Sequence, residues 1–154
     1  MNGPAWPGPR QSAGDGPLSI DTVFATADVV SLHCPLTPET RHLVNERRLA
    51  MMKPTAILVN TARGGCVDEA ALIRALTSGR LFGAALDVYA REPEIDPGLL
   101  ACPRLLLAPH IGSATIEART AMAQLCADAV ISVLRGHRPP NLVNNVSPTW
   151  SHRY

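Results

Sequence analysis

The stretch that decides the fold is Thr55-Ala56-Ile57-Leu58-Val59-Asn60-Thr61-Ala62-Arg63-Gly64-Gly65, where an apolar run passes directly into a polar, glycine-rich turn. Residues 55–60 show no alternation of apolar and polar side chains. Strands with that pattern are covered on both faces, as in a parallel sheet between two layers of helices. We therefore predict a buried parallel strand here, followed by a loop at the edge of the sheet where ligands bind.

Three other apolar runs have the length and composition of strands. They cover residues 28–33, 82–88 and 104–108. Segments with helical patterns separate them, and connections of that length require parallel strands with right-handed crossovers. The sequence thus predicts an α/β fold, a partial doubly wound, Rossmann-like parallel sheet of about four strands.

Two short helices are predicted from their capping residues. Asn45 precedes a helical pattern over residues 46–52 that Pro54 ends, and Asp68 precedes a second one over residues 69–78. Asparagine and aspartate accept hydrogen bonds from the free N–H groups of a first helical turn. Gly79 follows the second pattern, and we expect it to adopt the left-handed backbone conformation that ends a helix.

A long helix is predicted to open at Ser113 and to end at Gly136. Its apolar residues recur at spacings of four, three, four and four, which gives one continuous apolar face. These residues are Ala118, Met122, Leu125, Ala129 and Val133. With this helix, the partial nucleotide-binding domain is predicted over residues 18–136.

The two ends of the chain read differently from its centre. Residues 1–17 contain four glycines and four prolines and are predicted to be a disordered leader, and residues 137–154 are predicted to be a tail.

The net charge is +1 over 154 residues, which does not indicate a basic surface that would bind nucleic acid or an anionic membrane. No apolar run is long enough to span a bilayer.

Four widely spaced cysteines form no C-x-x-C pair, so we expect reduced thiols and a cytoplasmic location. A metal site built from His33, Cys34, Cys66 and His110 matches no zinc spacing, and none is predicted.

Polar residues follow the predicted strands, and each has a simple and a chemical interpretation. Either Arg63 is a surface arginine that pairs with an acid, or its planar guanidinium group binds a small carboxylate. Asp87 caps a turn, or anchors a ligand group such as an amide. His110 is an exposed or structural histidine, or an acid and base oriented by a carboxylate. Glu92 is a solvated loop residue or that carboxylate.

Taken together, these side chains suit reversible hydride transfer at a 2-hydroxy or 2-oxo acid. Arg63 would hold the substrate carboxylate and polarise the carbonyl group, and His110 would protonate the carbonyl oxygen. A nicotinamide would carry the hydride.

Four stretches resemble the D-isomer-specific 2-hydroxyacid dehydrogenases, a family that includes glyoxylate/hydroxypyruvate reductases and phosphoglycerate dehydrogenase. They occur in the family's order. The stretches are Ala27-Asp28-Val29-Val30-Ser31-Leu32-His33-Cys34-Pro35-Leu36-Thr37, Val59-Asn60-Thr61-Ala62-Arg63-Gly64-Gly65, Ala85-Leu86-Asp87-Val88-Tyr89 with Glu92-Pro93, and Pro109-His110-Ile111-Gly112-Ser113-Ala114-Thr115.

The resemblance implies a catalytic trio, a cofactor and a partner. Arg63, Glu92 and His110 would be catalytic, with Arg63 and His110 also touching substrate. NAD or NADP would be the cofactor, and the partners would be a small 2-oxo or 2-hydroxy acid and a second copy of the chain in a homodimer. Cofactor contacts are implied at Pro35, Thr40, Thr61, Ala62, Arg63, Asp87, His110, Ile111, Gly112 and Ser113.

The sequence also departs from the family pattern. Its one G-x-G, Gly14-Asp15-Gly16, follows no strand and lacks the third glycine, so it is not a phosphate loop. We expect that the first βαβ unit is missing and that the truncated chain alone is weakly active or inactive. The alternative is a non-catalytic remnant that dimerises or binds a partner. The choice between NAD and NADP stays open, as does the exact substrate.

Overall fold

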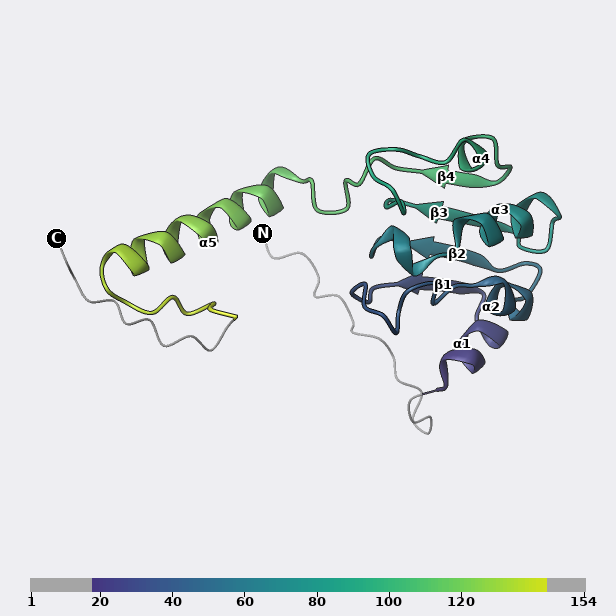
Figure 1. The fold of residues 1–154 in the computed structure, drawn as a ribbon, viewed down its shortest axis with the longest axis horizontal. Coiled ribbons are helices and arrows are strands. Elements are labelled where there is room, and N and C mark those ends of the chain that lie inside the picture. The colour runs from purple at the N-terminus through teal and green to yellow at the C-terminus, as the bar shows by residue number, and fades with distance from the viewer. Residues whose placement is uncertain (1–17, 144–154) are drawn as a thin grey trace, which may run out of the picture. The chain divides into compact units, whose positions relative to one another are not determined.

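The computed structural model describes residues 18–143, which fall into two compact units (Figure 1). One unit ends at Pro109 and the other begins at His110. The predicted leader, residues 1–17, and residues 144–154 of the predicted tail lie outside the described residues.

A four-stranded parallel sheet forms the centre of the first unit. Its strands are β1 (Val29–Leu32), β2 (Ile57–Asn60), β3 (Gly83–Leu86) and β4 (Leu105–Leu107). They pair in sequence order, β1-β2-β3-β4. This confirms the predicted fold class and all four predicted strands.

One helix precedes β1, three connect consecutive strands, and all four pack against their neighbours along the sheet. They are α1 (Ile20–Thr26), α2 (Glu46–Met51), α3 (Glu69–Thr77) and α4 (Pro97–Leu100). The predicted caps of α2 and α3 are confirmed. The Asn45 side chain accepts from the N–H of Arg48 at 3.1 Å, and the Asp68 side chain from that of Ala71 at 3.0 Å. Gly79 has the left-handed φ of 73° that was expected after α3.

The sheet buries one face against these helices. Alternate residues of β1 point into the core or away from it, so that Val30 and Leu32 are buried while Val29 is 57% exposed. For β1, the prediction of a strand covered on both faces is therefore wrong, whereas in β3 three of the four residues are buried and only Ala85 is half-buried. Successive right-handed crossovers in one direction place their helices on the same side of a sheet.

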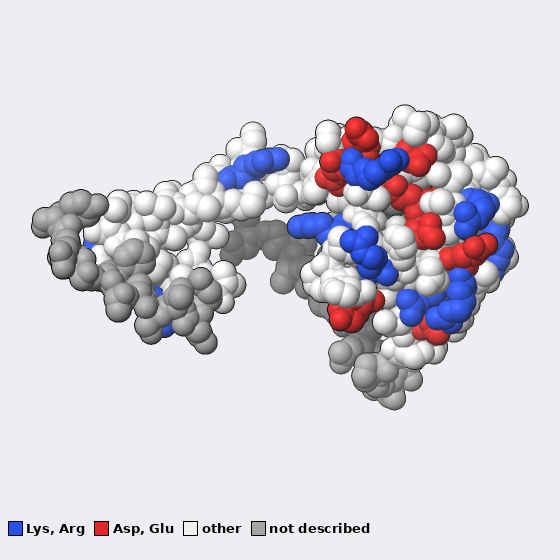
Figure 2. Space-filling view, in the orientation of Figure 1, with Lys and Arg blue, Asp and Glu red and all other residues white. Residues whose placement is uncertain are grey.

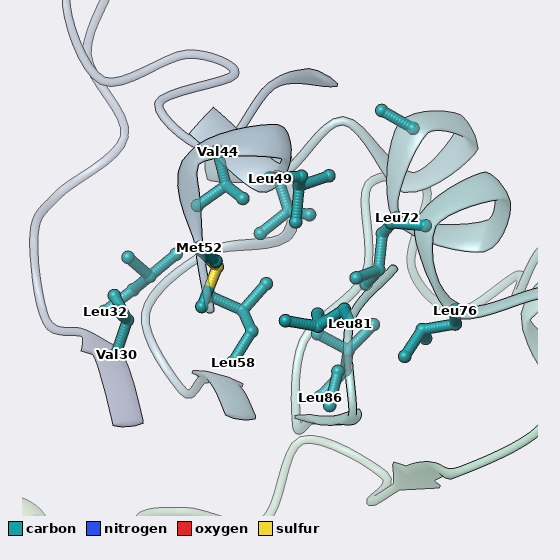
Figure 3. Close-up of a cluster of buried hydrophobic side chains, with 14 of the residues drawn as sticks. Val30, Leu32, Val44, Leu49, Met52, Leu58, Leu72, Leu76, Leu81 and Leu86 are labelled. Carbon is teal, nitrogen blue, oxygen red and sulfur yellow. The ribbon is translucent and has the colours of Figure 1, made fainter. Parts of the chain in front are cut away.

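Leucines from the sheet and the helices fill the core of this unit. Leu58, Leu72 and Leu76 are fully buried, and Figure 3 shows them among the labelled side chains that strands and helices contribute to the core. A core of this kind fixes the positions of the strands, and therefore of the loops that follow them.

The second unit contains the long helix α5 (Ile116–Leu134). Its N-cap is Thr115, whose hydroxyl accepts from the N–H of Ala118 at 3.1 Å. The prediction that Ser113 opens this helix is therefore wrong. Ala114 N–H instead donates to the carbonyl of Ile111 at 2.9 Å, so a turn precedes the first helical residue. The predicted end at Gly136 agrees with its φ of 75°.

None of the α5 side chains is buried, and Figure 2 shows few charged residues along it. No helix within residues 18–143 is both long enough and apolar enough to cross a membrane. On the face of the first unit shown in Figure 2, acidic and basic side chains are mixed.

Candidate functional site

A cleft of about 700 Å³ lies at the carboxyl ends of β1 and β2. Because the two strands are parallel neighbours, the loops that leave them meet at the same edge of the sheet. Four of the predicted cofactor residues line this cleft, Pro35 from one loop and Thr61, Ala62 and Arg63 from the other. His33, Cys34 and Leu36 complete its lining.

Asn60, the last residue of β2, holds the Arg63 loop in place. It is fully buried, and its side-chain amide donates to the carbonyl of Arg63 at 3.0 Å. Its side-chain oxygen accepts from the N–H of Ala62, also at 3.0 Å. A buried amide with two backbone partners pins the loop by both of its ends.

Arg63 is exposed at the mouth of the cleft. Its Nη1 donates to the carbonyl of Ala62 at 2.6 Å, which folds the guanidinium back along its own loop. Among residues 18–143, no carboxylate forms an ion pair with it. The surface pairing considered from the sequence is thus not what the structure shows.

Gly64 brings the Arg63 loop against the loop that follows β3. A side chain here would collide with the backbone of Tyr89 and Ala90, which cannot move aside. The two loops therefore lie in direct contact. This is the close approach that only glycine permits.

Glu92 belongs to that second loop. Its carboxylate accepts a hydrogen bond from the N–H of Tyr89 at 2.9 Å. Glu69, at the start of α3, accepts from the N–H of Ala90 at 2.7 Å. Two carboxylates thus hold the turn that carries Glu92 beside the Arg63 loop.

Tyr89 anchors the same turn to the residue that follows β4. Its hydroxyl donates to the carbonyl of Ala108 at 2.6 Å. Burial, and then the nearby charge of Asp87, raise the pKa of the Tyr89 phenol, so it remains a donor at neutral pH. Asp87 is itself buried, at 7% exposure, at the end of β3.

Thr40 shapes the β1 loop and is absent from the lining of the cleft. Its hydroxyl donates to the carbonyl of Pro35 at 2.6 Å and accepts from the N–H of Thr37 at 2.7 Å. The structure therefore gives it a role in positioning Pro35.

His110 begins the second unit, and Ile111, Gly112 and Ser113 follow it toward α5. Its φ of 54° is in the left-handed region, which is uncommon for any residue other than glycine. Backbone conformations of this kind are concentrated at functional sites.

The first unit thus brings Arg63, Glu92 and Asp87 onto adjoining loops, and places Pro35, Thr61 and Ala62 around the cleft. The roles of Asn60 and Glu69 in positioning these loops were not predicted from the sequence. Nor was the lining of the cleft by His33 and Cys34. A polar residue at the end of an apolar strand was the available signal for Asn60. Within the described part of the chain, no cluster of three or more His, Cys, Asp or Glu side chains is suited to hold a metal.

The cleft shares three features with cofactor sites in parallel α/β sheets. It is open, it lies at the carboxyl edge, and a cationic side chain stands at its mouth. An arginine of this kind also recognises a carboxylate bidentately.

Comparison with known proteins gives one consistent family. Residues 8–112 match the family described as D-isomer specific 2-hydroxyacid dehydrogenase, NAD binding domain. A glyoxylate reductase from Thermofilum pendens is 54% identical over 127 residues, which are 81% of this chain and 37% of that protein.

Two solved structures are similar in fold. A glyoxylate reductase from Paecilomyes thermophila is 43% identical with a TM-score of 0.72, over 79% of this chain and 37% of the other. An NADPH-dependent glyoxylate/hydroxypyruvate reductase from Sinorhizobium meliloti, in complex with NADP and malonate, is 35% identical with a TM-score of 0.72. The match covers 75% of this chain and 36% of that one.

The chain therefore spans about two fifths of the length of the curated relatives it matches. The family match covers more than half of its own residues. This chain belongs to the D-isomer specific 2-hydroxyacid dehydrogenase family, and the match lies in that family's NAD-binding domain.

Proposed function

We propose that this chain supplies the cofactor cleft and the catalytic side chains of an NAD(P)-dependent 2-hydroxyacid dehydrogenase. The substrate would be a small 2-oxo acid such as glyoxylate or hydroxypyruvate. The observation that carries the proposal is the contact of the Arg63 loop with the loop of Glu92, next to a cleft at the carboxyl edge of the sheet. The names of the relatives support the choice of substrate.

Each of three side chains has a role in this proposal. Arg63 binds the substrate carboxylate through two parallel hydrogen bonds and orients the carbonyl group. His110 donates a proton to the carbonyl oxygen, and in the reverse reaction takes it from the hydroxyl. Glu92 orients the imidazole ring.

In this proposal the cleft receives the part of a nicotinamide dinucleotide that its lining can reach, since that lining combines apolar walls with Thr61, Arg63 and His33. Such a cofactor, when bound, supplies the hydride. Pro35 and Ala62 would contact it through their apolar surfaces. Asp87 would accept a hydrogen bond from the amide of the ring.

The proposal includes a homodimer and a cytoplasmic location. The exposed apolar side chains of α5, among them Met122 and Leu125, support self-association. The four cysteines are free thiols, as is usual in a reducing compartment.

A non-catalytic module that binds a partner is the second candidate, and the exposed apolar side chains of α5 favour it. A pure scaffold, however, has no need of Arg63, Glu92 and His110 together. NADH and NADPH titrations of the isotope-labelled chain, followed by amide NMR, discriminate between the two. We expect shift changes at residues 33–36, 60–65 and 87–92. Unchanged spectra at millimolar cofactor would favour the scaffold.

Catalysis is tested in a chimera. The matched segment of the Thermofilum pendens relative is replaced by that of this chain, which restores the parts of the relative that the match does not cover. We expect NAD(P)H-dependent reduction of glyoxylate that depends on Arg63 and His110.

A further inference from the structure

Two cysteine thiols lie beside each other at the cleft. The Sγ atoms of Cys34 and Cys66 are 4.0 Å apart although the residues are 32 positions apart in the sequence. Cys34 is half-buried and lines the cleft, whereas Cys66 is fully buried. The other two cysteines differ, since Cys102 contacts the carbonyl of Ile73 and Cys126 is exposed on α5.

The backbone holds both thiols in position. Cys66 closes a short 3-10 turn, η1 (Gly64–Cys66), with its N–H donating to the carbonyl of Arg63 at 3.1 Å. Its own carbonyl accepts from the N–H of Val44 at 3.0 Å. On the other side, Thr40 fixes the carbonyl of Pro35, the residue after Cys34. The backbone of these two loops therefore places the two sulfur atoms side by side.

We propose that Cys34 and Cys66 form an oxidisable dithiol, which hydrogen peroxide entering the cleft converts into an intrachain disulfide. The sulfur atoms would approach from 4.0 Å to the bonded distance of about 2.0 Å. Of the two side chains, Cys34 is the one with room to rotate, because it is half-buried and lines the cleft.

The reaction proceeds in two balanced steps. The thiolate of Cys34 attacks one peroxide oxygen and the O–O bond breaks. The leaving hydroxide takes up a proton as water, and Cys34 becomes a sulfenic acid. The Cys66 sulfur, having lost its proton, then attacks the Cys34 sulfur, and the S–O bond breaks with release of a second water. Two thiols and one peroxide thus give one disulfide and two waters.

Burial favours this order of events. The cleft gives peroxide access to Cys34, while Cys66 has no exposed surface. Burial, together with the adjacent Cys34, raises the pKa of the Cys66 thiol. Cys66 is therefore the resolving cysteine, which reacts only after Cys34 has been oxidised.

The test uses the full chain with Cys102→Ser and Cys126→Ser, so that only the pair remains. After treatment with hydrogen peroxide we expect both free thiols to disappear and the intact mass to fall by two hydrogen atoms. Trypsin should release residues 11–41 linked to residues 64–74, and dithiothreitol should separate them.

Two single variants in the same background separate the roles. Cys66→Ser should stop at a Cys34 sulfenic acid that dimedone captures, and Cys34→Ser should leave Cys66 as a free thiol. Amide spectra of each variant verify the fold. Two free thiols after peroxide treatment, or sulfinic acid on Cys34 with Cys66 still free, would overturn the proposal.

The disulfide would lie in the wall of the cleft beside Pro35 and Arg63. We expect oxidation to weaken NADH binding, and this consequence alone rests on the proposed function. The two ideas fail separately. If the disulfide forms but neither redox form binds NADH, the dithiol stands and the proposed function falls. If NADH binds and no disulfide forms, the proposed function stands and the dithiol falls.

Discussion

The side-chain amide of Asn60 donates to the carbonyl of Arg63 at 3.0 Å, from a position with no exposed surface. In the register of the sheet, Asn60 lies between Leu32 and Leu86, both of them buried apolar residues. A polar residue in that row is costly unless it is fully hydrogen-bonded. Its two bonds to the Arg63 loop satisfy it, and they tie the position of the loop to the core.

Asn60→Ala should destabilise the fold by about 2–3 kcal/mol, because it leaves the buried N–H of Ala62 without a partner. Urea unfolding followed by circular dichroism measures this. The matched control is Asn45→Ala, which removes the cap of α2 and should cost about 1 kcal/mol. Equal costs for the two variants would contradict the role given to Asn60.

Gly64→Ala should be more disruptive than Gly65→Ala. At Gly64 the new methyl group meets the backbone of Tyr89, whereas at Gly65 it meets the side chain of Leu36 at 3.0 Å, which can rotate away. We expect a loss of about 3 kcal/mol or more for the first variant and about 1 kcal/mol for the second. Thermal unfolding of both variants checks the order, and a reversed order would refute the close approach of the two loops.

Much of the fold could be predicted because its signals are local. The strand of residues 55–60 is a continuous apolar run, and Asn45 and Asp68 are strong helix caps. The predicted start of α5 was wrong because Ser113 and Thr115 are both good N-cap residues. Only the turn formed by Ile111 and Ala114 chooses between them.

Other features depend on tertiary structure. The short helices α1 and α4 were not predicted, although Ser19 and Asp96 cap them much as Asn45 caps α2. A cap on its own also suits a turn, and seven or four residues add too little apolar periodicity to choose between the two. Coverage of the sheet on one face follows from the direction of the crossovers, which an apolar run does not encode. In the same way, the contact between Cys34 and Cys66 joins positions whose sequence spacing carries no signal.

Because of Asp21, the free energy of unfolding of the first unit should depend on pH. Hydrogen bonds from Arg47 and then Arg48 lower the pKa of its carboxyl group from 3.8 to about 2. A pKa that is lower in the folded state means that the stabilisation is present above pH 3.8, and is lost as the pH falls toward about 2.

Asp21→Asn should therefore reduce the stability at pH 6, and the difference from the wild type should shrink between pH 4 and pH 2. Urea unfolding at a series of pH values measures this. The account of Asp21 is wrong if the difference between the two proteins is the same at pH 6 and at pH 2.

The α5 helix should drive association of the chain. Leu125 is 56% exposed and Met122 is 46% exposed on the same helix. Sedimentation velocity should show a larger species that grows with concentration, and Leu125→Glu should shift it toward the monomer. Gln124→Glu adds the same charge to the adjacent residue and should have a smaller effect. A wild-type monomer at all concentrations would exclude this role for α5.

The central claim is that Arg63 of this chain binds the carboxylate of a 2-oxo acid during its reduction. The most direct measurement is kcat/KM for glyoxylate in the chimera, with and without Arg63→Ala. We predict a loss of about 100-fold or more, since a bidentate ionic hydrogen bond contributes about 3 kcal/mol. Arg74→Ala, which breaks an exposed ion pair with Glu46, should leave the value nearly unchanged. A folded chimera that reduces glyoxylate equally well with alanine at position 63 would contradict the claim.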